Sequence, residues 1–171
     1  MVAKSIARTV EIALTVNGER VEARVEAGRH LVDFLRLDLG LTGSHAGCEH
    51  GVCGACTLEV DGILVRGCLM LAAQLDGADV WTIEGASETK AIRDLQDAFV
   101  ARNALQCGFC TPGMLIAAKA LLDESPSPDR AMIREYLGGN YCRCTGYEAI
   151  IDAIQTVAEA RAKSPTPGDA A

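Results

Sequence analysis

The eight cysteines of this 171-residue chain constrain its fold more than any other feature. Three of them, with three glycines, stand within the first ten residues of "GCEHGVCGACTLEV" at 47–60. Cysteines this close together form disulfides in an oxidising compartment or bind metal in a reducing one. A disulfide scaffold suits a chain too short to form a core, and this chain is long enough and starts without a secretory signal. We therefore predict a cytoplasmic protein whose cysteines bind metal.

The first set of cysteines has the spacing Cys48-x4-Cys53-x2-Cys56, and the next hairpin supplies Cys68 after eleven more residues. This spacing is the plant-type ferredoxin pattern for a 2Fe–2S cluster. Two ferric ions, two sulfides and four thiolates carry a net charge of about −2, which backbone N–H groups stabilise. The glycines of the loop allow the backbone to come close to the sulfurs. The loop is therefore predicted to wrap an iron–sulfur cluster.

Two other metal sites fit this loop less well. Structural zinc prefers two separate C-x2-C or C-x2–4-C pairs. The loop instead has three consecutive ligands separated by four and then two residues, which fits zinc poorly. A Rieske site needs two histidines and two cysteines, so a second box with a cysteine and a histidine would have to follow. The other histidines, His30 and His45, both precede the loop, so a Rieske site is not expected. We interpret His45 and His50 as polar loop residues with local hydrogen bonds.

The second set consists of the pair Cys107-x2-Cys110 and the pair Cys142-x-Cys144. Two such pairs are compatible with zinc, with redox thiols and with an iron–sulfur cluster. The spacing alone favours iron–sulfur only modestly, so zinc stays open at this point.

The residues after each pair carry helix-start signals. Thr111 and Pro112 follow the first pair as an N-cap and a proline in the first turn. Thr145 follows the second pair, with Glu148 three residues later, as in a capping box. Each pair is thus predicted to lie just before a helix N-terminus, so that two positive dipole ends face one anionic site.

The N-terminal half of the chain carries the strand signals. Apolar and polar residues alternate over 10–26 around Asn17-Gly18, which predicts a hairpin with a type I′ turn. A second hairpin is predicted to turn at Asp61-Gly62. The other expected elements are a helix at 30–39, a short helical piece at 69–75 and a strand at 79–83. Together they form a small mixed sheet with one helix packed across it.

After about residue 85 the strand signals end and apolar residues recur at helical spacing. The four amphipathic stretches are 88–102, 114–122, 132–137 and 150–158. Short loops join them, which predicts a four-helix bundle. The expected class is therefore α+β, with a sheet domain at 10–84, a helical domain at 85–162 and a disordered tail at 163–171.

Charge and composition exclude several functions. A net charge of −7, spread evenly, repels phosphate backbones, so no nucleic-acid binding is expected. No apolar run approaches about 18 residues, so no membrane span is expected. The chain has no phosphate-binding glycine loop and no paired nucleophile and base. No substrate chemistry, and no catalytic residue, is therefore predicted on this chain.

Three motifs carry a resemblance to a known family. In order, "GCEHGVCGACT", "QCGFCTPGM" and "GNYCRCTGYE" resemble the small iron–sulfur subunit of the molybdenum hydroxylases, the xanthine dehydrogenase/aldehyde oxidase family, over about residues 10–160. The resemblance implies a ferredoxin-like β-grasp domain with one 2Fe–2S cluster on the first four cysteines. It also implies a helical domain with another 2Fe–2S cluster on the second four.

The resemblance further implies partner chains and an electron-transfer role. A large subunit would carry molybdopterin and a medium subunit FAD, in a dimer of heterotrimers, and Gln106 and Cys144 match positions that approach the pterin. Single electrons would pass from molybdopterin through the helical-domain cluster and then the ferredoxin-like cluster to FAD or another acceptor. The alternatives are a free-standing ferredoxin-like carrier, which would need only the first half, and a zinc-stabilised interaction module.

Overall fold

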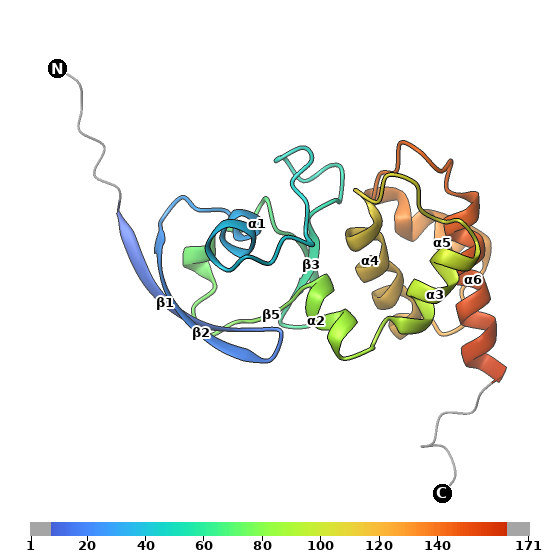
Figure 1. The fold of residues 1–171 in the computed structure, drawn as a ribbon, viewed down its shortest axis with the longest axis horizontal. Coiled ribbons are helices and arrows are strands. Elements are labelled where there is room, and N and C mark those ends of the chain that lie inside the picture. Colours follow the sequence, from blue (N-terminus) through green and yellow to red (C-terminus); the bar gives the residue numbers. More distant parts are fainter. Residues whose placement is uncertain (1–7, 164–171) are drawn as a thin grey trace, which may run out of the picture.

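The computed structural model describes residues 8–163 as two parts that lie side by side. Figure 1 shows the sheet part, in blue to green, next to the helical part, in yellow to red. Each part has its own cluster of buried apolar residues. The predicted α+β class is thus confirmed.

A single five-stranded sheet forms the first part, in the order β2-β1-β5-β3-β4. β1 pairs antiparallel with β2 and parallel with β5, and β3 pairs antiparallel with β5 and β4. The strands are β1 (Thr9–Val16), β2 (Glu19–Glu26), β3 (Thr57–Val60), β4 (Ile63–Arg66) and β5 (Asp79–Trp81). The parallel pair brings the two hairpins into one sheet.

Both predicted hairpins are present, each with a two-residue turn. Asn17 and Gly18 have φ angles of 54° and 86°, and Asp61 and Gly62 have φ angles of 49° and 77°. Positive φ at both central residues is the requirement of a type I′ turn, which Asn-Gly and Asp-Gly satisfy at low cost. The turn chemistry therefore fixes the register of each hairpin.

The helix predicted at 30–39 is helical but not uniform. It starts as α1 (Leu31–Asp33) and widens into the π-helix η1 (Phe34–Asp38), where the N–H of Leu39 donates to the carbonyl of Phe34. Its apolar side chains Leu31, Phe34 and Leu35 are fully buried against the sheet. The predicted buried face is therefore correct, although the hydrogen bonding of the second half differs.

Two shorter elements differ from their predicted bounds. The piece at 69–75 contains only the 3-10 turn η2 (Ala72–Gln74). β5 ends at Trp81 because the N–H of Thr82 donates to Oδ1 of Asn17 at 2.9 Å, and α2 (Ile83–Glu88) begins directly afterwards. The strand predicted at 79–83 is thus two residues shorter.

The four predicted helices of the second part correspond to α3–α6, with α2 as an additional helix at the junction. Their bounds are α3 (Arg93–Ala101), α4 (Thr111–Glu124), α5 (Arg130–Tyr136) and α6 (Glu148–Lys163), with the 3-10 turn η3 (Leu137–Gly139) after α5. α6 includes Lys163, the first residue of the predicted tail, and the rest of that tail lies outside the described residues. None of the helices within 8–163 is long and apolar enough to cross a membrane.

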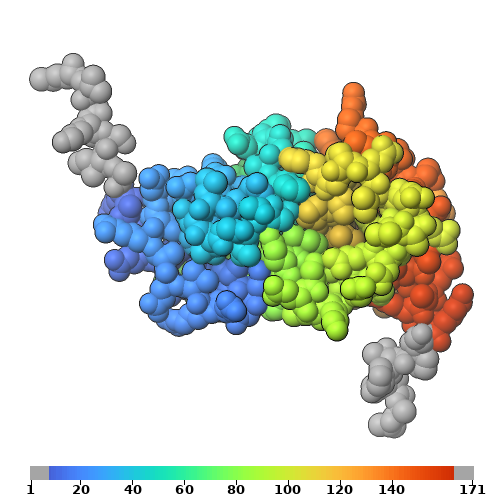
Figure 2. All heavy atoms as spheres, viewed as in Figure 1, coloured from blue at the N-terminus to red at the C-terminus, as the bar shows by residue number. Residues whose placement is uncertain are grey.

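α4 joins the two parts. Eight of its 14 residues are buried, because one side packs on β3 while the others face α2, α3 and α5. An ion pair spans the junction, with Nζ of Lys119 at 3.6 Å from Oε2 of Glu59. In the space-filling view the cyan loop of the first part lies directly against the yellow segment of the second (Figure 2). These are the segments that carry cysteines.

Candidate iron–sulfur sites

All eight cysteines are free, and the fold gathers them into the two predicted sets. In the first set, Cys48, Cys53 and Cys56 lie in the loop between η1 and β3, and Cys68 lies just after β4. In the second set, Cys107 and Cys110 precede α4, and Cys142 and Cys144 lie between η3 and α6. Over residues 8–163, no three His, Cys, Asp or Glu side chains are grouped as a single metal ion would require. The sulfurs instead approach one another in pairs.

The first set forms an outer and an inner pair. Sγ of Cys48 accepts a hydrogen bond from the N–H of Cys53 at 3.3 Å, and this bond, with another from the backbone of His50, lowers the pKa of Cys48 to about 6. Cys56 and Cys68 are buried together against Val32, and burial raises the pKa of Cys56 to about 11. A cluster here would therefore lie between an exposed edge and the sheet.

Close approach explains the glycines of this loop. A Cβ on Gly47 would lie 3.0 Å from Sγ of Cys53, so a side chain there would crowd the sulfur. Gly54 has φ +73°, and a Cβ on it would lie 2.3 Å from the carbonyl oxygen of Gly139 in the helical part. Gly47 thus makes room for the sulfur, as predicted, whereas Gly54 makes room for the other half of the chain.

The second set also forms two pairs, and each pair takes one cysteine from each segment. The sulfurs of Cys107 and Cys144 are 3.6 Å apart and exposed. Cys110 lies against Cys142, and burial, together with the neighbouring Cys142, raises the pKa of Cys110 to about 12. The helical packing therefore brings together residues that lie far apart in the sequence.

The start of α4 differs from the predicted cap. The N-cap is Cys110 itself, without a side-chain hydrogen bond, and Thr111 and Pro112 are the first two helical residues. The cysteine pair does lie at the helix N-terminus, as predicted, but no threonine oxygen caps it.

The capping box predicted between Thr145 and Glu148 is wrong. The hydroxyl oxygen of Thr145 accepts a hydrogen bond from the N–H of Tyr147 at 3.2 Å and lies 3.1 Å from Sγ of Cys142. The carboxylate of Glu148 instead accepts hydrogen bonds from the guanidinium groups of Arg130 and Arg134. Burial acts to raise the pKa of Cys142, but the Thr145 hydroxyl and backbone N–H groups outweigh it, so this pKa is lowered.

The two residues with an expected position near the pterin lie side by side. Nε2 of Gln106 donates a hydrogen bond to the carbonyl of Cys144 at 3.1 Å, and both residues are exposed. They occupy the same edge of the helical part as the exposed Cys107–Cys144 pair. That edge is therefore available to a partner.

His45 and His50 both make hydrogen bonds, as polar loop residues do. Nδ1 of His50 donates to the carbonyl of Cys48, which is the local bond predicted for it. His45 differs, because its Nδ1 donates to the carbonyl of Phe109 at 2.8 Å and its ring stacks on that of Phe109 at 4.6 Å. His45 therefore connects the two parts of the molecule.

Sequence analysis missed Asn140, which is only 4% exposed at the junction. Its Nδ2 donates to the carbonyls of Gly54 and Gly113, each at 3.1 Å, and to the hydroxyl of Thr57 at 3.0 Å. Its Oδ1 accepts from Arg66 at 3.4 Å. This one side chain thus holds the first cysteine loop, β3 and α4 together, and only its position two residues before Cys142 could have drawn attention to it.

A backbone contact also joins the two cysteine sets. The N–H of Tyr141 donates to the carbonyl of Cys53 at 2.8 Å. Nη2 of Arg66 donates to the carbonyl of Gly139 at 2.7 Å. The segment that leads into Cys142 is therefore attached directly to the first cysteine loop.

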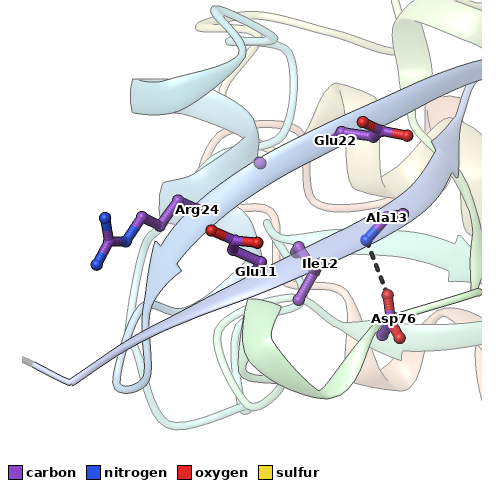
Figure 3. Close-up of a pocket in the computed structure, with 7 residues that line it drawn as sticks. Glu11, Ile12, Ala13, Glu22, Arg24 and Asp76 are labelled. Atoms are coloured by element: carbon purple, nitrogen blue, oxygen red, sulfur yellow. Dashed lines mark hydrogen bonds between the residues drawn. The ribbon is translucent and has the colours of Figure 1, made fainter.

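A surface hollow lies away from both cysteine sets. Its volume is about 420 Å³, and Figure 3 shows residues that line it, most of them on strands β1 and β2. Its lining residues are Glu11, Ile12, Ala13, Glu22, Ala23, Arg24 and Asp76. The carboxylate of Asp76 accepts a hydrogen bond from the N–H of Ala13 at 2.8 Å (Figure 3). No cysteine lines this hollow, so it is separate from both sets.

Comparison with known families identifies both halves of the chain. Residues 14–80 match the family described as a 2Fe–2S iron–sulfur cluster binding domain, and residues 82–155 match a second 2Fe–2S binding domain. The chain is 52% identical to the nicotine 6-hydroxylase small subunit of Paenarthrobacter nicotinovorans, over 85% of this chain and 87% of the relative. It is 51% identical to the caffeine dehydrogenase subunit gamma of Pseudomonas sp. (strain CBB1), over 85% and 89% of the two chains.

A solved structure agrees with these relatives. Quinoline 2-oxidoreductase from Pseudomonas putida 86 superposes with a TM-score of 0.85 at 49% identity, over 92% of this chain and 99% of that chain. Both 2Fe–2S families and these subunits of oxidoreductases match across nearly the whole described chain. The chain therefore belongs to the small iron–sulfur subunits of the molybdenum hydroxylase (xanthine dehydrogenase/aldehyde oxidase) family, whose members are subunits of oxidoreductases.

Proposed function

We propose that each set of four cysteines binds one 2Fe–2S cluster. The ligands of the first are Cys48, Cys53, Cys56 and Cys68, and those of the second are Cys107, Cys110, Cys142 and Cys144. The observation that carries this proposal is the pairing of sulfurs: each set consists of two pairs, as two irons with two thiolates each require. The first cluster would lie in a ferredoxin-like β-grasp domain (10–84) and the second in a four-helix bundle (85–162).

The residues around each set suit a negatively charged cluster. The N–H of Cys53 already points at Sγ of Cys48, and the bare Gly47 leaves the sulfur of Cys53 uncovered. In the second set, Cys110 is the N-cap of the 14-residue helix α4, where the positive end of the helix dipole favours negative charge. A bound cluster would supply one-electron acceptance and release, and the chain would hold and orient it.

The chain would pass single electrons from molybdopterin to the helical-domain cluster, then to the ferredoxin-like cluster, and on to FAD or another acceptor. Two observations support this order. Gln106 and the exposed Cys144 lie together at an edge of the helical part, where they could face a pterin. The N–H of Tyr141, next to Cys142, donates to the carbonyl of Cys53, so one backbone hydrogen bond lies between the segments that carry the two sets.

The partners would be a large subunit with molybdopterin and a medium subunit with FAD, in a dimer of heterotrimers. The names of the two relatives, a small subunit and a subunit gamma, support a multi-subunit enzyme. Eight free cysteines as ligands would suit the reducing cytoplasm. The names of the similar proteins contain nicotine, caffeine and quinoline, so nitrogen heterocycles are the first substrates to assay with the complete enzyme.

Metal analysis of the full chain tests the proposal. We expect four irons and four sulfides per chain, and two distinct signals of reduced clusters by electron paramagnetic resonance. Cys53→Ala should remove one signal and Cys110→Ala the other, so that each variant is the control for its counterpart. Zinc in place of iron, or a single cluster in the unmodified chain, would contradict the assignment.

A further inference from the structure

The hydroxyl group of Thr145 takes part in two hydrogen bonds, one as acceptor and one as donor. The N–H of Tyr147 can only donate, so the Thr145 oxygen accepts that bond, at 3.2 Å. The other polar neighbour of this oxygen is Sγ of Cys142, at 3.1 Å. The hydroxyl hydrogen therefore points at the sulfur, and Thr145 is the donor in that contact.

The turn around Thr145 holds this geometry. Gly146 and Tyr147 both have positive φ angles, of 67° and 68°, which returns the chain toward Cys142. The Tyr147 hydroxyl oxygen then accepts a hydrogen bond from the N–H of Cys142 at 2.9 Å. Thr145 and Tyr147 thus contact Cys142 at two points, its sulfur and its backbone N–H.

Two other threonines provide an internal comparison, because each also directly follows a cysteine. Thr57 follows Cys56, but its hydroxyl donates to the carbonyl of Gly54 at 2.6 Å. Thr111 follows Cys110 as the first residue of α4, and its hydroxyl is not among the groups that bond to the Cys110 sulfur in residues 8–163. Of the three Cys-Thr steps in the described chain, only the one at Thr145 directs a hydroxyl at a cysteine sulfur. The contact is therefore not a simple consequence of the local sequence.

We infer that Thr145 is a positioning residue that raises the reduction potential of the helical-domain cluster. This inference rests on the proposed assignment of Cys142 as a ligand. Reduction adds one electron to the cluster and makes the thiolate sulfur more negative, so a hydrogen bond to that sulfur stabilises the reduced form more than the oxidised form. Without the hydroxyl, the helical-domain cluster would be a weaker electron acceptor, while the ferredoxin-like cluster, with its own hydrogen bonds, would be unaffected.

The test is a redox titration of the full chain with both clusters bound, followed by electron paramagnetic resonance. Thr145→Val keeps the shape of the side chain and removes the donor. At a fixed ambient potential we expect the ratio of reduced to oxidised helical-domain cluster to fall about fivefold to tenfold, or about 40–60 mV for a one-electron couple. Thr145→Ser should keep the original midpoint, and Thr111→Val, the matched control, should also leave it unchanged.

The outcomes separate this inference from the proposed function. If the unmodified chain lacks a second iron–sulfur signal, the proposed function itself is wrong. If both signals are present but Thr145→Val titrates like the unmodified chain, or Thr111→Val shifts the midpoint as much, the tuning role is wrong and the proposed function stands. If Thr145→Val does not bind the cluster, Thr145→Ala repeats the test. Failure of both to bind it shows that the hydroxyl holds the cluster rather than tunes it, which also overturns the inference.

Discussion

The two cysteine sets are built in different ways. Three of the four cysteines of the first set lie in one loop, and the strand β4 delivers the fourth directly after the hairpin. The second set joins two segments on either side of α4 and α5, and each sulfur pair crosses between those segments. The first site is therefore mostly a local structure, whereas the second exists only when the helices have packed. The predictions below test how independent the two sites are.

The largest effect is expected from interrupting the proposed order of electron transfer. In a complete enzyme with Cys110→Ala, substrate should still reduce molybdenum, while the ferredoxin-like cluster stays oxidised during turnover. Dithionite should reduce that same cluster normally, because it enters from solvent. The measurement is rapid freeze-quench electron paramagnetic resonance.

The reciprocal variant is the control for this experiment. With Cys53→Ala, substrate should reduce the helical-domain cluster and leave the flavin oxidised. Reduction of the ferredoxin-like cluster at the normal rate in the Cys110→Ala enzyme would show that the order is wrong.

A pair of glycine variants asks whether the first loop depends on the helical part. Gly54 and Gly62 have nearly the same φ, +73° and +77°, but a Cβ on Gly54 would lie 2.3 Å from the carbonyl of Gly139, whereas nothing lies within 4 Å of a Cβ on Gly62. Gly62→Ala should cost only the left-handed conformation, about 1–2 kcal/mol. Gly54→Ala should cost clearly more and reduce the iron content of the first site. If both variants lower the free energy of unfolding equally in chemical denaturation, the first loop does not depend on close packing against the helical part.

Asn140→Ala tests the contact between the two sites. The variant leaves the buried carbonyls of Gly54 and Gly113 and the guanidinium of Arg66 without this partner. Each lost buried partner costs about 1–3 kcal/mol, part of which water recovers, so we expect a total of about 2–4 kcal/mol in the free energy of unfolding. Tyr141→Ala is the control, because this neighbouring side chain is 53% exposed and its N–H still donates to Cys53. If both variants are equally stable, Asn140 does not hold the junction.

The smallest effect is expected from the ion pair across the junction. Burial lowers the pKa of Lys119, but Asp123 at 2.9 Å and Glu59 at 3.6 Å outweigh it, so the pKa is raised from 10.5. A raised lysine pKa stabilises the fold below pH 10.5, and this stability is lost as the pH rises through the raised value. Lys119→Met should therefore cost about 0.2–1 kcal/mol at pH 8 and progressively less above pH 10.5.

Arg93→Met is the matched control for this pH dependence. Arg93 pairs with Asp97 within α3, at 3.2 Å, and arginine as a residue type, unlike lysine, keeps its proton in proteins. Its effect on unfolding should be the same at pH 8 and above pH 10.5. A Lys119→Met effect that is equally constant would exclude the proposed ion-pair contribution.

Local rules explain which parts of the structure could be predicted from the sequence. Asn17-Gly18 and Asp61-Gly62 determine their turns by themselves, so both hairpins have the expected register. The helix-like periodicity of the second half likewise gave the approximate positions of α3–α6. Both family matches agree with the prediction that each half binds an iron–sulfur cluster.

Predictions failed where a side chain had a choice of partners. Thr145 has the sequence context of a helix cap, but its hydroxyl lies against the sulfur of Cys142, which only the folded loop brings close. The side-chain oxygen of Asn17 accepts a hydrogen bond from the N–H of Thr82, and β5 therefore ends earlier than predicted. His45 was expected to bond locally, but it bonds to Phe109, 64 residues away. The His45 contact depends on how the two halves meet, whereas the Thr145 and Asn17 contacts depend on how a loop and the edge of the sheet close within one half.

The close approach of Gly54 and Gly113 has a consequence for engineering. A Cβ on Gly113 would lie 2.5 Å from the carbonyl oxygen of Gly54, so bare backbone meets bare backbone where the halves join. A ferredoxin domain taken from another protein would need the same empty surface at this point to replace the first half. We therefore expect chimeras that are joined at the outer ends of the two-part body to be more stable than chimeras that are joined between α2 and α3.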